Sequence, residues 1–68
     1  MSTEHQKKVA ELLKQARIQH GLTQNEVAEK AGISTNTYAR IERAEQEPKS
    51  ESLRKLVKAL NIDPSKVL

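Results

Sequence analysis

The sequence predicts an all-α fold, a compact bundle of four to five helices in a single domain over residues 1–68. Apolar residues recur three or four positions apart in each of the longer segments, which is the spacing of one helix face. No segment alternates apolar and polar residues as a half-buried strand does. The glycines and prolines fall between the periodic segments and mark helix boundaries: Gly21, Gly32, Pro48 and Pro64.

The first helix is predicted over residues 4–20. Thr3 can cap its first turn while Gln6, three residues later, reaches back to the backbone of Thr3. Gly21 can end the helix. Its apolar face is formed by Val9, Leu12, Leu13 and Ala16.

Two short helices joined by a tight turn, a helix-turn-helix, are predicted over residues 24–43. Thr23 opens a T-x-x-E capping box for the first of them, and Ser34 can cap the second. Gly32 can adopt the left-handed conformation that ends the first helix and reverses the chain. Ala28 is small enough for the second helix to cross close by. The apolar residues that hold the two helices together are Ile33, Tyr38 and Ile41.

A fourth helix is predicted from about Ser50 to Asn61, followed by a short terminal turn. Its apolar face is formed by Leu53, Leu56, Val57 and Leu60. Pro64 follows Asp63 and suits the first position of a last helical turn.

Composition excludes several classes of function. The chain has no cysteine, so it offers neither a disulfide nor a thiolate zinc site, and His5 and His20 have no neighbours at metal-ligand spacing. We find no Ser/His/Asp constellation and no glycine-rich phosphate loop, and therefore expect no enzyme, no cofactor and no small-molecule site. No apolar run is long enough to span a membrane and the start lacks a signal core, so we expect a cytoplasmic protein. The net charge of +3 permits a polyanionic partner without requiring one.

The run from about Leu12 to Ile62 resembles the Cro/phage-repressor type (Xre-type) helix-turn-helix family. The anchors of this resemblance are Arg17, the Gly-Leu-Thr-Gln of residues 21–24, Ala28, Gly32, the Ile-Glu of residues 41–42 and Pro48. The resemblance implies a lambda-repressor-like DNA-binding domain of transcriptional regulators, which usually act as homodimers on inverted repeats. We therefore expect a sequence-specific double-stranded DNA-binding regulator, and a repressor rather than an activator.

The second motif helix has a polar outer face. With Tyr38 and Ile41 directed inward, the residues on the other side at about 100° per residue are Thr35, Asn36, Ala39, Arg40 and Arg43. Asparagine can bond adenine, arginine can bond guanine, and a threonine or alanine methyl can touch the thymine methyl. In similar proteins the positions of Thr35, Asn36 and Arg40 contact bases, and Ala39 completes our set of candidate base contacts. The alternative is an ordinary solvated helix face, and Thr35 could also bond a phosphate or help to cap its helix.

Other residues are expected to contact DNA phosphates or to stabilise the motif. Gln24 lies in the first turn of its helix, where backbone N–H groups favour an anion, and the resemblance implies that it bonds a DNA phosphate. Arg43 and Lys49 are further candidate phosphate contacts. The resemblance also implies a structural ion pair between Arg17 and Glu42, beneath the motif.

The chain departs from the family pattern after the second motif helix. Ala44 stands where a glycine is common, so we expect this helix to continue slightly further. Glu45 and Glu47 replace basic residues, and we expect their carboxylates either to weaken binding or to turn away from DNA phosphates.

Two questions stay open in the sequence. The chain could instead be a protein-interaction module, such as an antitoxin or adaptor, or the DNA-targeting domain of a larger regulator. A dimer contact is expected on the fourth helix and the terminal turn, around Leu60, Ile62, Val67 and Leu68, unless these residues simply close the core.

Overall fold

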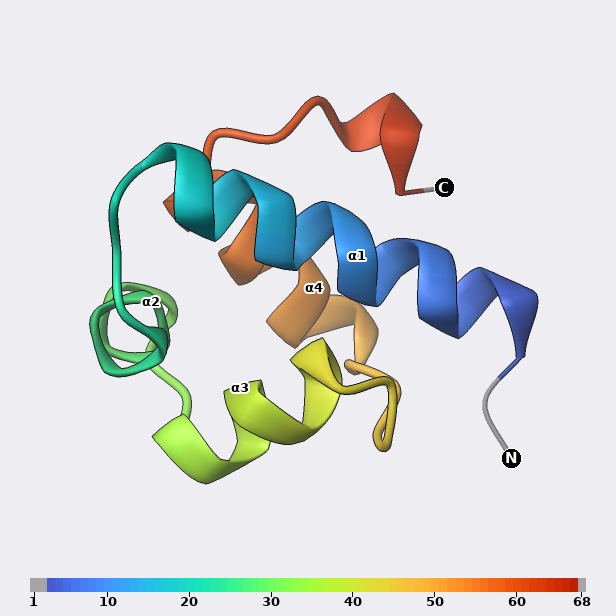
Figure 1. The fold of residues 1–68 in the computed structure, drawn as a ribbon, viewed down its shortest axis with the longest axis horizontal. Coiled ribbons are helices and arrows are strands. Elements are labelled where there is room, and N and C mark those ends of the chain that lie inside the picture. The colour runs from blue at the N-terminus through green and yellow to red at the C-terminus, as the bar shows by residue number, and fades with distance from the viewer. Residues whose placement is uncertain (1–2, 68) are drawn as a thin grey trace.

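The computed structural model describes residues 3–67 and is all-α over that range (Figure 1). The elements are α1 (Glu4–Gln19), α2 (Gln24–Ala31), α3 (Thr35–Glu42), α4 (Ser50–Ala59) and the short 3-10 turn η1 (Pro64–Lys66). The predicted fold class is therefore confirmed. No helix within the described range is long and apolar enough to cross a membrane.

The starts of α1 and α2 follow their capping residues. The Thr3 hydroxyl accepts from the backbone N–H of Gln6 at 3.1 Å, and the Gln6 side chain accepts from the Thr3 N–H at 2.8 Å. Thr23 and Glu26 form the same reciprocal pair at the start of α2. These bonds satisfy N–H groups that have no partner within the helix, which fixes where each helix begins.

All four α-helices of the described residues end in one backbone arrangement, the Schellman motif. After α1, Gly21 adopts φ +68° and the Leu22 N–H returns to the Arg17 carbonyl at 3.1 Å. After α4, Asn61 adopts φ +52°, so the helix ends two residues before the predicted boundary. Each motif satisfies carbonyl groups that the last turn would leave without a donor.

Our expectation that α3 continues past its usual end was wrong. Ala44 itself takes the left-handed conformation, φ +60°, and the Glu45 N–H bonds the Arg40 carbonyl at 2.9 Å. The two returning hydrogen bonds of the Schellman motif stop the helix at Glu42, even though an alanine occupies the position that favours glycine.

Ala44→Gly is expected to raise the free energy of unfolding by about 0.5–1 kcal/mol, because an L-residue in this region is strained and glycine is not. Thermal unfolding followed by circular dichroism measures the change. Asn61→Gly is the matched control and should gain less, since asparagine tolerates this conformation better than alanine. An equal or larger gain at Asn61 would contradict this explanation.

The core forms where the four helices meet. α2 packs against both α3 and α4, and α1 packs against α3. The most deeply buried large side chains are Leu13, Val27, Tyr38, Ile41, Leu56 and Leu60. Figure 1 shows α1 crossing the molecule with α3 on one side of it and the C-terminal segment on the other.

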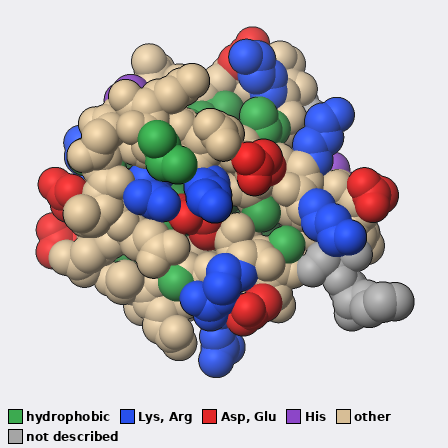
Figure 2. Space-filling view, in the orientation of Figure 1, with side chains coloured by type: hydrophobic (Ala, Val, Ile, Leu, Met, Phe, Trp, Pro, Cys, Tyr) green, Lys and Arg blue, Asp and Glu red, His purple; other side chains and the backbone are tan. Residues whose placement is uncertain are grey.

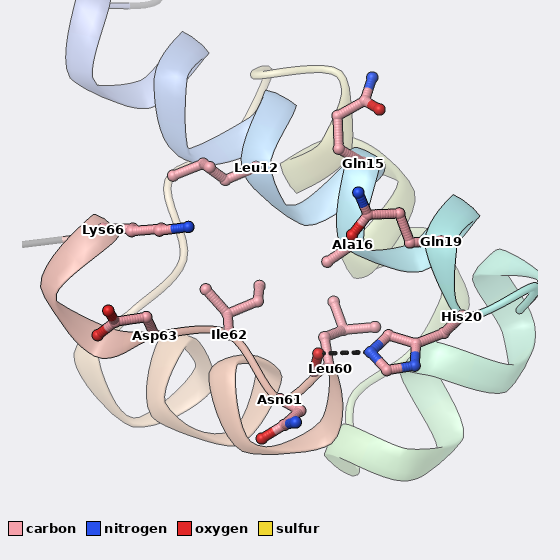
Figure 3. Close-up of a pocket in the computed structure, with 10 residues that line it drawn as sticks. All are labelled: Leu12, Gln15, Ala16, Gln19, His20, Leu60, Asn61, Ile62, Asp63 and Lys66. Atoms are coloured by element: carbon pink, nitrogen blue, oxygen red, sulfur yellow. Dashed lines mark hydrogen bonds between the residues drawn. The ribbon is translucent and has the colours of Figure 1, made fainter.

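The C-terminal apolar residues mainly close this core, which is the alternative that the sequence left open beside a dimer contact. Leu60 and Val67 are buried, and Ile62 is partly buried and packs against the core cluster. Leu68 lies outside the described residues. The imidazole Nε2 of His20 lies 2.8 Å from the Leu60 carbonyl and joins the end of α1 to the end of α4, beside a surface cleft of about 250 Å³ (Figure 3).

Candidate nucleic-acid interface

Helix α3 is held on α2 by one face only. Tyr38 and Ile41 are buried, and on the α2 side Ala28 is buried as well. Gly32, at φ +71°, turns the chain between the two helices. Because the inward face is fixed by apolar packing, the outer face of α3 keeps a defined orientation.

Three of the four residues predicted to contact bases are exposed on this outer face. They are Thr35, Asn36 and Arg40, while Ala39 is half-buried between them. Within residues 3–67 we find no side-chain hydrogen bond or ion pair made by Asn36 or Arg40. Their donors and acceptors are therefore available to an external partner.

Thr35 differs from these two residues because its hydroxyl is already bonded. It donates to the Asn25 side-chain oxygen of α2 at 2.7 Å. Ser34, and not Thr35, caps α3, accepting from the Thr37 N–H at 3.0 Å. Asn25 was not predicted from the sequence, although its position next to Gln24 in the first turn of α2 was an available signal.

Beneath the motif, Arg17 and Glu42 form a bidentate ion pair. Arg17 Nε donates to Glu42 Oε2 and Nη2 donates to Oε1, both at 2.9 Å. The remaining Arg17 Nη1 donates to the Leu22 carbonyl at 2.9 Å. The pair joins α1, the following loop and α3. Its Glu42 side chain is only 5 % exposed and its Arg17 side chain 18 % exposed.

Gln24 extends this network toward the surface. It is half-buried, and its Nε2 donates to Glu42 Oε1 at 3.3 Å. Burial alone would raise the pKa of Glu42, but hydrogen bonds from Arg17 and Gln24 and the nearby Tyr38 hydroxyl outweigh it and hold this pKa below its ordinary value.

The Tyr38 hydroxyl is buried close to the ion pair. It has no hydrogen bond of good geometry within the described residues. Burial, and then the nearby Glu42 carboxylate, raise the pKa of Tyr38 above its ordinary value, so the phenol stays protonated. Its role in this structure is to fill the core beneath the motif.

The candidate phosphate contacts after α3 lie in a mixed charge environment. Arg43 is paired with Glu45, with Nε donating to Oε2 at 2.8 Å and Nη2 to Oε1 at 3.2 Å. Both side chains are 54 % exposed. This hydrogen-bonded pairing raises the pKa of Arg43 and lowers that of Glu45. Lys49 is exposed at the start of α4. Glu45 therefore binds the guanidinium of Arg43, which we predicted to contact a DNA phosphate.

Glu45→Gln is expected to raise affinity for duplex DNA by roughly threefold to tenfold, because it removes a repelling charge and releases Arg43 for phosphate. Fluorescence anisotropy with a labelled duplex measures the change. Glu47→Gln removes the same charge from the same loop, from a residue that makes no ion pair within residues 3–67, and should raise affinity less. Equal gains in the two variants would show that Glu45 does not compete for Arg43.

The wider surface has no continuous basic stripe in the view of Figure 2, where Lys and Arg side chains alternate with Asp and Glu. No group of three or more His, Asp or Glu side chains that could hold a metal occurs between residues 3 and 67. On this face, a preference for a polyanion would therefore come from a few placed side chains and not from a continuous basic surface.

Comparison with known protein families supports the helix-turn-helix described above. A family model described as helix-turn-helix matches residues 13–67, which is most of the chain. Neither the curated proteins nor the solved structures give a match. The matched range includes Arg17, all of α2, α3 and α4, and the loops between them.

Proposed function

The chain belongs to the helix-turn-helix family of the Cro/phage-repressor type, and on this basis we propose that it is a sequence-specific regulator of transcription that binds double-stranded DNA. Its role would be binding and not catalysis, and its place of action the cytoplasm. We expect a repressor, because occupying an operator is sufficient to block transcription, whereas activation needs a further productive contact.

One observation supports this proposal most strongly. The outer face of α3 presents Asn36 and Arg40, exposed and without bonded partners among the described residues, on a helix whose opposite face is buried. A major groove admits an α-helix, and bidentate side chains can distinguish its base pairs. In this arrangement Asn36 can form hydrogen bonds with adenine and Arg40 can form them with guanine, while the Ala39 methyl can contact the methyl group of thymine.

The backbone of the DNA would be held by residues at the edges of this face. Gln24 lies in the first turn of α2, and the hydrogen bond from its amide to Glu42 fixes the orientation of the side chain. Arg43 can bind a phosphate by exchanging its contact with Glu45, and Lys49 can do so directly. Such contacts set position and salt dependence and do not select sequence.

We propose that the protein acts as a homodimer through the exposed side of α4. Leu53 and Val57 are only partly buried there, and together with Pro64 they line a groove of about 330 Å³. Two copies would place their α3 helices about one DNA turn apart, roughly 34 Å, which predicts an inverted-repeat operator.

Salt dependence tests the DNA-binding proposal. The affinity for a 30-base-pair duplex should fall linearly with the logarithm of salt concentration, and Lys49→Ala should reduce the slope by about one. Gln24→Ala should weaken binding to all sequences alike without changing the slope, since a neutral amide releases no counterion. If the folded chain bound no duplex DNA at low salt, the alternative role as a protein-interaction module, an antitoxin or adaptor, would replace this proposal.

A further inference from the structure

The side chains of Asn25 and Thr35 meet across the turn of the motif. Asn25 lies in the first turn of α2 and Thr35 begins α3, and the Thr35 hydroxyl donates to the Asn25 side-chain oxygen at 2.7 Å. This is the usual distance of an O–H···O hydrogen bond. Both residues are exposed, at the end of α3 that precedes Asn36 and Arg40.

The direction of this bond decides what the pair can offer to a partner. A threonine hydroxyl has a single proton, and here Asn25 accepts it. Thr35 is left with an oxygen that accepts and a methyl group. Asn25 has its oxygen engaged and is left with an NH₂ group that donates. Side by side, the pair presents one acceptor and one donor.

The fold itself does not require this bond. Ser34 already caps α3, and the packing of α2 on α3 is made by buried residues such as Ala28 and Ile41. A hydrogen bond between two exposed side chains replaces bonds that both groups would otherwise make to water, so it adds little to the stability of the fold. The placement of the pair on the outer face is therefore better explained by recognition than by folding.

We propose that Asn25 is a specificity-determining residue that acts with Thr35 to recognise one adenine. The major-groove edge of adenine presents the N6 amino donor beside the N7 acceptor. The Thr35 oxygen accepts from N6, and the Asn25 amide donates to N7. Two short side chains from different helices thus perform the bidentate contact that a single asparagine or glutamine makes elsewhere. This inference rests on the proposed DNA-binding function.

The test compares base preference in wild type, Asn25→Ala, Thr35→Val and the double variant, by measuring affinity for a selected half-site and for all its single-base changes. Wild type should prefer adenine at one position by roughly 5-fold to 100-fold. Each single variant should lose that preference at the same position, and the double variant should lose no more than either single variant. Thr35→Ser should keep the preference, because it retains the hydroxyl.

Gln19→Ala is the matched control, since it removes an exposed amide from α1, beside the cleft drawn in Figure 3, and should leave every preference unchanged. Thermal unfolding verifies that all variants are folded. Loss of preference at two different positions, additive effects, or uniform weakening by Asn25→Ala would overturn the proposed pairing alone. A wild-type profile without any base preference would overturn the proposed function and this inference with it.

Discussion

Arg17→Ala is expected to lower the free energy of unfolding by about 3–5 kcal/mol, which is the usual cost of removing one partner from a buried ion pair. The variant would leave the Glu42 carboxylate, 5 % exposed, without its bidentate partner, and the Leu22 carbonyl without its donor. A domain of this size is stabilised by only about 5–15 kcal/mol in total, and usually lies near the lower limit. DNA binding should therefore be lost through unfolding, although Arg17 lies beneath the reading face.

Urea unfolding followed by circular dichroism at pH 7 measures this loss. Arg54→Ala is the matched control, because Arg54 is exposed on α4 and its removal should change stability by less than about 0.5 kcal/mol. Similar losses of unfolding free energy in both variants would show that the ion pair of Arg17 and Glu42 contributes no more to stability than an exposed side chain does.

The pH dependence separates the ion pair from simple loss of packing. The pKa of Glu42 is lowered in the folded state from an ordinary value of 4.5. Its contribution to stability is therefore fully present above about 4.5 and is lost as pH falls through the lower, folded value. Wild type should lose stability in this acidic range, and Glu42→Gln should lose less of its remaining stability there. An unchanged acid response in Glu42→Gln would contradict this origin.

Arg40→Ala is expected to weaken binding to the best site by about 1–3 kcal/mol and to remove the preference at one base pair. Arg40 is exposed on the outer face of α3, where a guanidinium can donate to the O6 and N7 of guanine together. The measurement is equilibrium binding to the selected site and to the three alternatives at each position.

Lys14→Ala gives the control, since it removes the same charge from another helix, α1, away from the groove proposed for the dimer. It should weaken binding to all sequences slightly and equally. If Arg40→Ala kept the same preferred sequence with only this uniform loss, the assignment of the reading face would be wrong.

Structural features that depend on residues only a few positions apart, such as helix caps, could be predicted from the sequence. Thr3, Thr23 and Ser34 cap their helices as expected, because a capping side chain bonds a backbone N–H only two or three residues away. The inward direction of Tyr38 and Ile41 followed in the same way from helical spacing.

Features that depend on the backbone path or on pairs of surface residues could not be predicted in this way. The stop at Glu42 depends on an alanine, Ala44, adopting a conformation that it does not favour by itself. The bonds of Asn25 to Thr35 and of Arg43 to Glu45 join polar side chains that no hydrophobic pattern records. The burial of Leu60 and Val67 could be recognised only once the path of the C-terminal segment over the core was known.

The most direct test of the central claim, that the outer face of α3 reads base pairs, is selection of binding sites from a random pool of duplex DNA by this chain at moderate salt. We expect enrichment of an inverted repeat whose half-sites lie about one helical turn apart. An enriched single half-site would still support reading by α3 and would contradict the dimer. No enrichment by a chain that is shown to be folded would contradict sequence-specific reading itself.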